Sequence, residues 1–138
     1  MQQQNGWMRL GNQVLTGILR SPLYPLAGTT LLITVTGRKS GKAYTLPVNY
    51  TQSGDAVTII SRTWRMWWRN LRGGAPVTLQ LHGREVKGWG TVVEDGPDVL
   101  ASLTEYVRRL PRVPRRYRDL AEAASTRVIV QVKLDGQV

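Results

Sequence analysis

Six short segments rich in β-branched and other apolar residues, separated by tight turns, restrict what this chain can fold into. The turns TQSGD and HGRE each join two neighbouring segments directly, which favours antiparallel pairing. Six strands with such short connections favour a closed or half-closed barrel, because closure leaves no exposed sheet edge. The predicted strands are 31–36, 43–50, 56–61, 76–82, 85–94 and 126–134.

Two of these strands carry residues that interrupt a regular ladder. The segment 43–50 alternates between an apolar and a polar face, and Pro47 lies on the polar face. Because proline has no N–H to donate, the strand should have a free edge or a bulge at that position. In the segment 85–94, Gly88 and Gly90 flank a tryptophan and indicate a bend or a close approach of another backbone.

Helical spacing predicts four further elements. A short helix is expected around 12–21, and the segment 62–72, RTWRMWWRNLR, is expected to form one helix with an aromatic stripe and a basic stripe. A helix over 96–110 should end at a proline, and a second helical stretch should follow Pro114. The chain is therefore predicted to be a single α+β domain over 1–138, mainly β, with flanking helices.

Composition limits the chemistry that such a domain can perform. The chain has no cysteine and one histidine, and its nine acidic residues are scattered, so no metal site and no cluster of catalytic side chains is predicted. If the protein is an enzyme, a bound cofactor must carry the chemistry. No apolar run approaches the roughly 18 residues of a membrane span, so a cytoplasmic protein is expected.

The chain carries a formal net charge of +10, which attracts anions such as nucleic acid, acidic lipid or a phosphorylated ligand. The turn GRKSGK, residues 37–42, combines three cations with two glycines. Glycine lets backbone N–H groups approach an anion closely, so the turn could hold a phosphate, although a solvated basic hairpin has the same composition. The arginine-rich segment 108–120 contains Tyr117, whose hydroxyl could reach a ligand.

A series of these motifs resembles the deazaflavin (coenzyme F420)-dependent nitroreductase family. The resemblance covers residues 30–94 best, and the residues that carry it are Gly37, Lys39, Ser40, Gly41, Pro47, Ser61, Trp67, Asn70, Leu71 and the strand from Pro76. It implies an antiparallel split β-barrel of about six strands that binds reduced F420. Such a protein would transfer a hydride to a quinone, enone or nitro-type acceptor, and family members form dimers or associate with membranes.

The resemblance also implies roles for individual residues. Ser61 and Tyr117 are the hydroxyls expected to donate a proton or orient the substrate. The helix face of Trp67 and Asn70 is expected to line the cofactor site, whereas Trp64 and Trp68 are expected to pack in the core. The residues predicted to bind the cofactor are Arg38, Lys39, Ser40, Gly41, Lys42, Pro47, Arg62, Trp67 and Asn70.

Three departures from the family pattern leave alternatives open. Tyr44 and Arg62 stand where an arginine and a lysine are common, and the loop between Ser61 and Trp67 is short. Related split barrels bind FMN, haem or lipid, so FMN is the alternative cofactor. A non-catalytic basic barrel that binds FMN, lipid or nucleic acid is the alternative function. The expected partners are a small-molecule substrate, a membrane surface and a second copy of the chain, with no specific nucleic acid.

Overall fold

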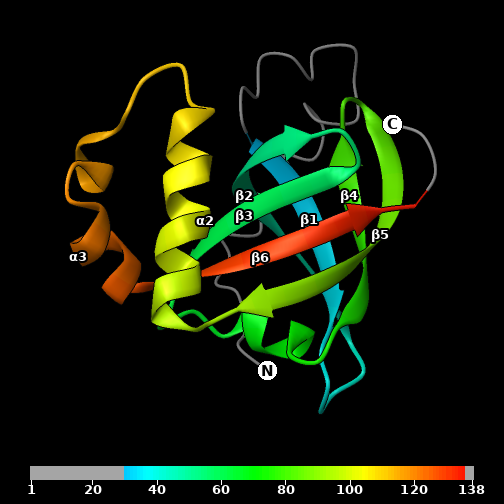
Figure 1. Cartoon of the computed structure of the whole chain (residues 1–138). Coiled ribbons are helices and arrows are strands. Elements are labelled where there is room, and N and C mark those ends of the chain that lie inside the picture. The colour runs from blue at the N-terminus through cyan, green and yellow to red at the C-terminus, as the bar shows by residue number, and fades with distance from the viewer. Residues whose placement is uncertain (1–29, 136–138) are drawn as a thin grey trace, which may run out of the picture.

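The computed structural model describes residues 30–135. The helix expected around 12–21 lies outside the described residues. Six antiparallel strands form a closed barrel in the order β1-β2-β3-β6-β5-β4, and β4 closes the barrel by pairing with β1 (Figure 1). The strands are β1 (Thr30–Thr36), β2 (Ala43–Ser53), β3 (Ala56–Arg62), β4 (Ala75–Leu81), β5 (Arg84–Val93) and β6 (Arg127–Leu134). The predicted barrel and all six predicted strands are confirmed.

Strand β2 pairs with two neighbours in succession along its length. Residues 43–49 pair with β1, whereas only residues 50–53 pair with β3. Pro47 therefore lies in the stretch that lacks a β3 partner, where its missing N–H removes no bond to β3. The free edge predicted at Pro47 is confirmed, and it leaves the barrel split between β2 and β3 at this end.

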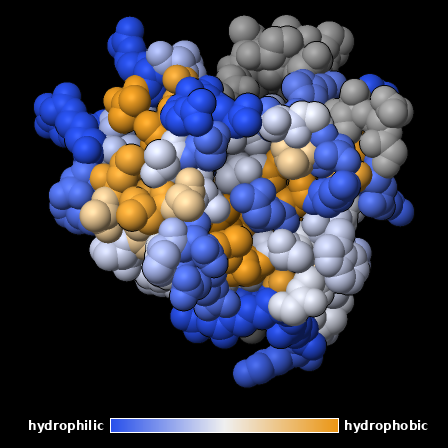
Figure 2. Space-filling model, viewed as in Figure 1, coloured by the Kyte–Doolittle hydropathy of each residue, from blue (hydrophilic) through white to orange (hydrophobic). Residues whose placement is uncertain are grey.

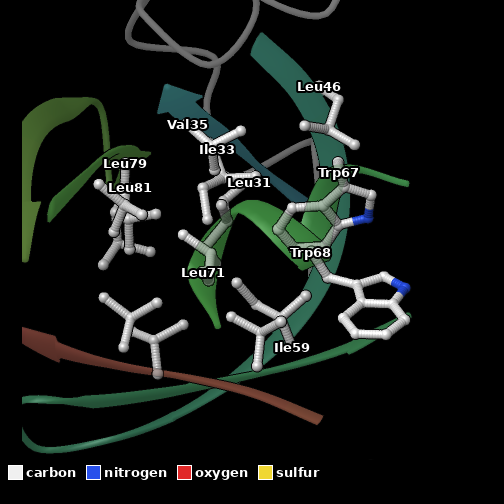
Figure 3. Packing of buried hydrophobic residues seen from close by; sticks show 14 of the residues in the cluster. Leu31, Ile33, Val35, Leu46, Ile59, Trp67, Trp68, Leu71, Leu79 and Leu81 are labelled. Atoms are coloured by element: carbon white, nitrogen blue, oxygen red, sulfur yellow. The ribbon is translucent and has the colours of Figure 1, made fainter. Parts of the chain in front are cut away.

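The barrel interior is a continuous apolar core. It is built from the inward-facing residues of all six strands and from one short helix, as Figure 3 shows for part of the cluster. The close approach predicted at Gly88 is present, because a Cβ added there would lie 2.7 Å from the carbonyl oxygen of Lys133. A Cβ at Gly90 would lie 3.3 Å from Leu71. These glycines let β6 and the short helix pack closely against β5.

A second, smaller core lies outside the barrel, between β6 and the helices. Helix α2 (Gly96–Arg108) and helix α3 (Leu120–Ser125) cover this face, with the 3-10 helix η3 (Arg115–Tyr117) between them (Figure 1). The rings of Tyr106 and Tyr117 meet edge to face, with 6.1 Å between their centroids. Burial raises the pKa of Tyr106 to about 12. Among the described residues, no helix is long and apolar enough to cross a bilayer.

The segment 62–72 is not a single helix, so that prediction is wrong. Strand β3 continues to Arg62, which pairs with Arg127 of β6, and only Trp67–Leu71 forms a 3-10 helix, η2. The turn that follows Arg62, closed by the bond from the N–H of Arg65 to the carbonyl of Arg62, leaves Trp64 69% exposed instead of packed. Trp68 is 2% exposed and packs as expected. The helical stretch expected after Pro114 is likewise divided into η3 and α3.

We expect Trp68→Ala to lower the free energy of unfolding by about 3–5 kcal/mol, because it empties a large volume in the core. It also removes the hydrogen bond from Trp68 Nε1 to the carbonyl oxygen of Arg62, which measures 3.2 Å. Trp64→Ala is the matched control, and should change the free energy of unfolding by less than about 0.5 kcal/mol. Denaturant unfolding of both variants measures this, and equal losses would contradict the assignment of Trp68 to the core.

Candidate cofactor site

The basic turn between β1 and β2 is held in one conformation by its own hydrogen bonds. The N–H of Gly37 donates to the carbonyl of Lys42 at 2.8 Å, and the N–H of Gly41 donates to the carbonyl of Gly37 at 2.9 Å. Ser40 Oγ accepts from the N–H of Lys42 at 3.2 Å and shares a hydrogen with Tyr44 Oη at 2.9 Å. Gly41 has a φ of +71°, which favours glycine.

Two backbone N–H groups of this turn have no acceptor among the described residues. The amides of Gly37, Arg38, Gly41 and Lys42 all donate to protein atoms. Those of Lys39 and Ser40 do not, and the side chains of Arg38, Lys39 and Lys42 are exposed. Two adjacent free amides beside three cations are the features of an anion site. Ser40 Oγ already bonds within the turn, so its main contribution is to fix the turn's shape.

Asn70 joins this turn to helix η2. Its Oδ1 accepts from the N–H of Arg38 at 3.0 Å, and its Nδ2 donates to the carbonyl oxygen of Trp67 at 3.1 Å. Trp67 and Asn70 are three residues apart, which is one turn of the 3-10 helix η2. The Asn70 side chain can therefore bond back to the carbonyl of Trp67. The side-chain amide uses both its donor and its acceptor, and places the turn against the end of the barrel.

Trp67 in turn joins η2 to β3. Its indole Nε1 donates to Ser61 Oγ at 3.1 Å, and both residues are buried, with 8% and 6% of their surfaces exposed. Because the hydroxyl oxygen accepts from the indole, the Ser61 hydroxyl proton must point elsewhere. In this structure it donates to the carbonyl oxygen of Arg62 over a long 3.3 Å. Figure 3 shows the two η2 indoles at one margin of the barrel core.

The arginines of the segment 62–72 divide into paired and unpaired groups. Arg72 makes a bidentate pair with Glu94, with two distances of 2.9 Å. This hydrogen bonding lowers the pKa of the Glu94 carboxyl, so the pair persists at neutral pH and weakens as the pH falls through that lowered value. The guanidinium of Arg69 lies 5.3 Å from the centroid of the Trp68 ring. Arg62 is exposed and makes no ion pair among the described residues.

The structure brings together most, but not all, of the residues singled out in the sequence. The turn 37–42, Asn70, Trp67 and Ser61 form one connected group, and Pro47 lies in the split of the barrel next to Leu46, a member of the same core cluster as Trp67.

Tyr117 lies in the second core instead. It is 5% exposed and contacts Tyr106, Arg116 and Arg127. Burial, with a smaller effect of Arg62, lowers the pKa of the Arg127 guanidinium.

Two contributions to this site were not recognised from the sequence. Tyr44 departs from the family pattern, yet its hydroxyl forms a hydrogen bond with Ser40 Oγ that holds the turn in shape. A Cβ on Gly37 would lie 2.8 Å from that hydroxyl, so Gly37 and Tyr44 fit together as a pair. The second is the bond from Asn70 to the Arg38 backbone, which joins residues 32 positions apart. Among the described residues, no cluster of side chains could hold a metal ion.

Similarity to solved structures is consistent with this fold. A protein described as an F420 reductase superposes with a TM-score of 0.51 and 16% identity, over 87% of this chain and 92% of that one. A chain described as a domain-swapped dimer gives a TM-score of 0.62 and 16% identity, over 92% and 97%. An FMN-binding protein from Nostoc punctiforme, related to pyridoxamine 5'-phosphate oxidase, gives 0.51 and 12%, over 95% and 81%. These identities establish the split-barrel fold alone.

Sequence comparison identifies the family. None of the curated proteins matches the chain significantly. The family model described as F420H(2)-dependent quinone reductase matches residues 12–135, nearly the whole chain. This confirms the F420-dependent oxidoreductase class and the cofactor expected from the resemblance, under a quinone reductase description in place of the nitroreductase one. The chain belongs to the F420H(2)-dependent quinone reductase family.

Proposed function

We propose that this protein transfers a hydride from reduced F420 to a quinone-type acceptor at the split end of the barrel. The observation that carries the proposal is the connected hydrogen-bond series from Ser61 through Trp67 and Asn70 to the amide of Arg38. It holds a buried hydroxyl and a preorganised anion site at fixed positions relative to each other. Reduced F420, when bound, supplies the hydride.

The basic turn has the donors that the cofactor's phosphate requires. The free amides of Lys39 and Ser40 would donate to phosphate oxygens, and the Lys39 ammonium would supply the charge. Arg38 and Lys42 add exposed positive charge for the acidic tail. FMN also carries a phosphate, so the expected preference for F420 rests on the extra charge of that tail.

The protein groups around the ring have positioning roles in this proposal. Pro47 offers an exposed apolar surface near the split in the barrel, Trp67 acts through its buried hydrogen bond to Ser61, and Arg62 adds an exposed charge at the end of β3. Ser61 would orient the acceptor by exchanging its long 3.3 Å bond to the Arg62 carbonyl oxygen for one to the acceptor, while its own oxygen keeps accepting from the Trp67 indole. Tyr117 does not enter the proposal, since its ring belongs to the second core.

An apolar acceptor is supported by the loop that follows Ser61 and Arg62. Trp64 and Met66 are 69% and 54% exposed, although side chains of this kind are usually covered. The two residues lie within five positions of Ser61 and offer an apolar contact for a hydrophobic quinone, whereas a small nitro compound or enone would use less of this surface. The homodimer and the cytoplasmic location remain predictions, to be checked by solution mass and by cell fractionation.

We expect F420 to bind with at least roughly tenfold higher affinity than FMN. The cofactor's polyanionic tail should add favourable contacts with a chain of net charge +10. Fluorescence titration of the purified protein with each cofactor measures both affinities. Equal or tighter binding of FMN would place the protein with the flavin-binding barrels.

Turnover provides the second part of this test. Reduced F420 should be oxidised anaerobically when a quinone is added, as followed by the absorbance of the deazaflavin ring. Binding of neither cofactor, or binding of F420 without oxidation by any quinone, would overturn the reductase proposal.

Lys39→Ala should reduce F420 affinity by roughly ten- to a hundredfold, because a charge-assisted bond contributes about 1.5–3 kcal/mol. Binding of a deazaflavin fragment without phosphate and tail should hardly change. Lys87→Ala is the control, since Lys87 is an exposed lysine on β5, outside the turn.

Salt should weaken binding of whole F420 to the parent protein more steeply than to Lys39→Ala. If fragment and whole cofactor lose affinity equally in Lys39→Ala, the turn shapes the ring pocket and does not bind the phosphate.

A further inference from the structure

A buried arginine without a carboxylate partner lies at the start of β6. Arg127 is 6% exposed and is the only buried charged side chain among the described residues. Its Nη1 donates to the carbonyl oxygen of Ala123 at 3.2 Å and to Thr126 Oγ1 at 3.1 Å. Both acceptors are neutral, and Arg127 makes no ion pair in the described part of the chain. Because burying a charge without an opposite charge is costly, this guanidinium calls for an explanation beyond packing.

A second arginine faces Arg127 from the neighbouring strand. Arg62, the last residue of β3, is the direct antiparallel partner of Arg127. Residues paired in this way point to the same face of the sheet, and like charges in directly opposite positions are destabilising. Burial, and after it the positive charge of Arg62, lowers the pKa of the Arg127 guanidinium, and Arg116 acts in the same direction. Positive charge is therefore concentrated here at a cost to the folded state.

Tyr117 brings the third arginine to the same place. The guanidinium carbons of Arg127 and Arg116 lie 5.2 and 5.0 Å from the centroid of its ring, and Tyr106 packs against that ring. Figure 2 shows hydrophilic groups projecting at the upper left, where Figure 1 has the α2–α3 connection that carries Arg116. Arg62 and Arg116 are exposed. The arginine cluster of Arg62, Arg116 and Arg127 is therefore buried at one side and open to solvent at the other.

The backbone that carries the arginine cluster is held by hydrogen bonds of its own. The N–H of Thr63 donates to the carbonyl of Thr126 at 3.0 Å, and Trp68 Nε1 donates to the carbonyl oxygen of Arg62 at 3.2 Å. Arg116 lies in η3, between α2 and α3. Because these positions are already ordered, an anion would lose less binding free energy to ordering the protein.

The arginine cluster is separate from the basic turn 37–42. Figure 1 shows the start of β6 beside α3 at the left, whereas the β1–β2 turn extends from the bottom of the barrel. Arg62 also points away from the barrel core, because the residue before it, Ser61, is buried on the opposite face of β3. An anion held by the turn 37–42 would therefore leave the arginine cluster without an opposite charge.

We propose that the arginine cluster binds one phosphate group, free or as a phosphate ester, at a site separate from the cofactor. Guanidinium groups present paired N–H donors that match two oxygens of a phosphate. A phosphate group carries close to two negative charges at neutral pH, which offsets most of three positive charges, whereas a carboxylate supplies one. The bonds of Arg127 to α3 would need only that one arginine, so they do not account for Arg62 and Arg116.

Calorimetric titration of the full chain with inorganic phosphate tests this proposal. Lys39→Ala serves as the parent, because the turn 37–42 would otherwise bind phosphate as well. Adding Arg62→Gln and Arg116→Gln should lower the phosphate affinity at least roughly tenfold, since one charge-assisted bond corresponds to roughly ten- to a hundredfold. The matched control, Arg84→Gln with Lys87→Gln, removes the same charge from exposed positions on β5 and should lower the affinity by less than about threefold, because distant exposed charges are screened.

Arg127→Met in the same parent separates phosphate binding from a structural role. It removes the buried charge, while the carbonyl of Ala123 still accepts from the N–H of Thr126 at 3.3 Å. The melting temperature without phosphate should therefore change little or rise. The increase in melting temperature that phosphate gives the parent should disappear. A variant that melts much lower, but that phosphate still stabilises as much as the parent, would show that Arg127 serves α3 alone.

The double variants contain only exposed substitutions, so they decide the proposal even if Arg127→Met fails to fold. Equal losses of phosphate affinity in the two double variants would show that net charge alone attracts the anion, and would overturn the site. Acetate binding as tight as phosphate binding would overturn the assignment to a phosphate group. Absence of phosphate binding in the Lys39→Ala parent would refute the site outright.

F420 titration of Arg127→Met, made in the unmodified chain, keeps this proposal distinct from the reductase proposal. The affinity for F420 should be unchanged. A loss of F420 affinity without a loss of stability would make the arginine cluster part of the cofactor site and would overturn a separate phosphate site. Phosphate binding that depends on Arg62 and Arg116, in a protein that fails to bind F420, would refute the reductase proposal alone.

Discussion

A single series of hydrogen bonds determines how the split end of the barrel is organised. It runs from Ser61 on β3 to the Trp67 indole, from the Trp67 carbonyl to the Asn70 amide, and from that amide to the backbone of Arg38. Three of its groups are at least partly buried, where leaving a donor or acceptor without a partner costs about 1–3 kcal/mol. The strand, the short helix and the basic turn therefore keep their relative positions, and a preformed anion site follows from this constraint.

Positive charge is distributed over two surfaces with different structural support. At the split end, Asn70 orders the turn 37–42, and the bidentate pair of Arg72 with Glu94 removes one arginine from the free charge. On the other surface, the buried Tyr117 orders the arginine-rich connection 108–118. A cofactor bound at the turn 37–42 would neutralise only the first surface, so the formal net charge of +10 is not concentrated at the candidate site alone.

The fold could be predicted from the sequence wherever local pattern decided the outcome. Alternation and turn residues located all six strands, and Pro47 located the free edge of β2. The prediction of one helix over 62–72 was wrong because the pairing of Arg62 with β6 is a contact between residues far apart in sequence, which overrides helical periodicity. The same kind of contact hid the link from Asn70 to Arg38 and the burial of Tyr117, since neither leaves a pattern in neighbouring residues.

The most direct measurement is the F420 affinity of Asn70→Ala. Asn49→Ala is the comparison, because it removes an exposed asparagine side chain from β2. Loss of the bonds to Arg38 and Trp67 should release the turn and lower F420 affinity by roughly tenfold, while the free energy of unfolding falls by less than about 1.5 kcal/mol. Asn49→Ala should leave affinity unchanged. Unaltered F420 binding by Asn70→Ala would contradict a cofactor site organised by this hydrogen-bond series.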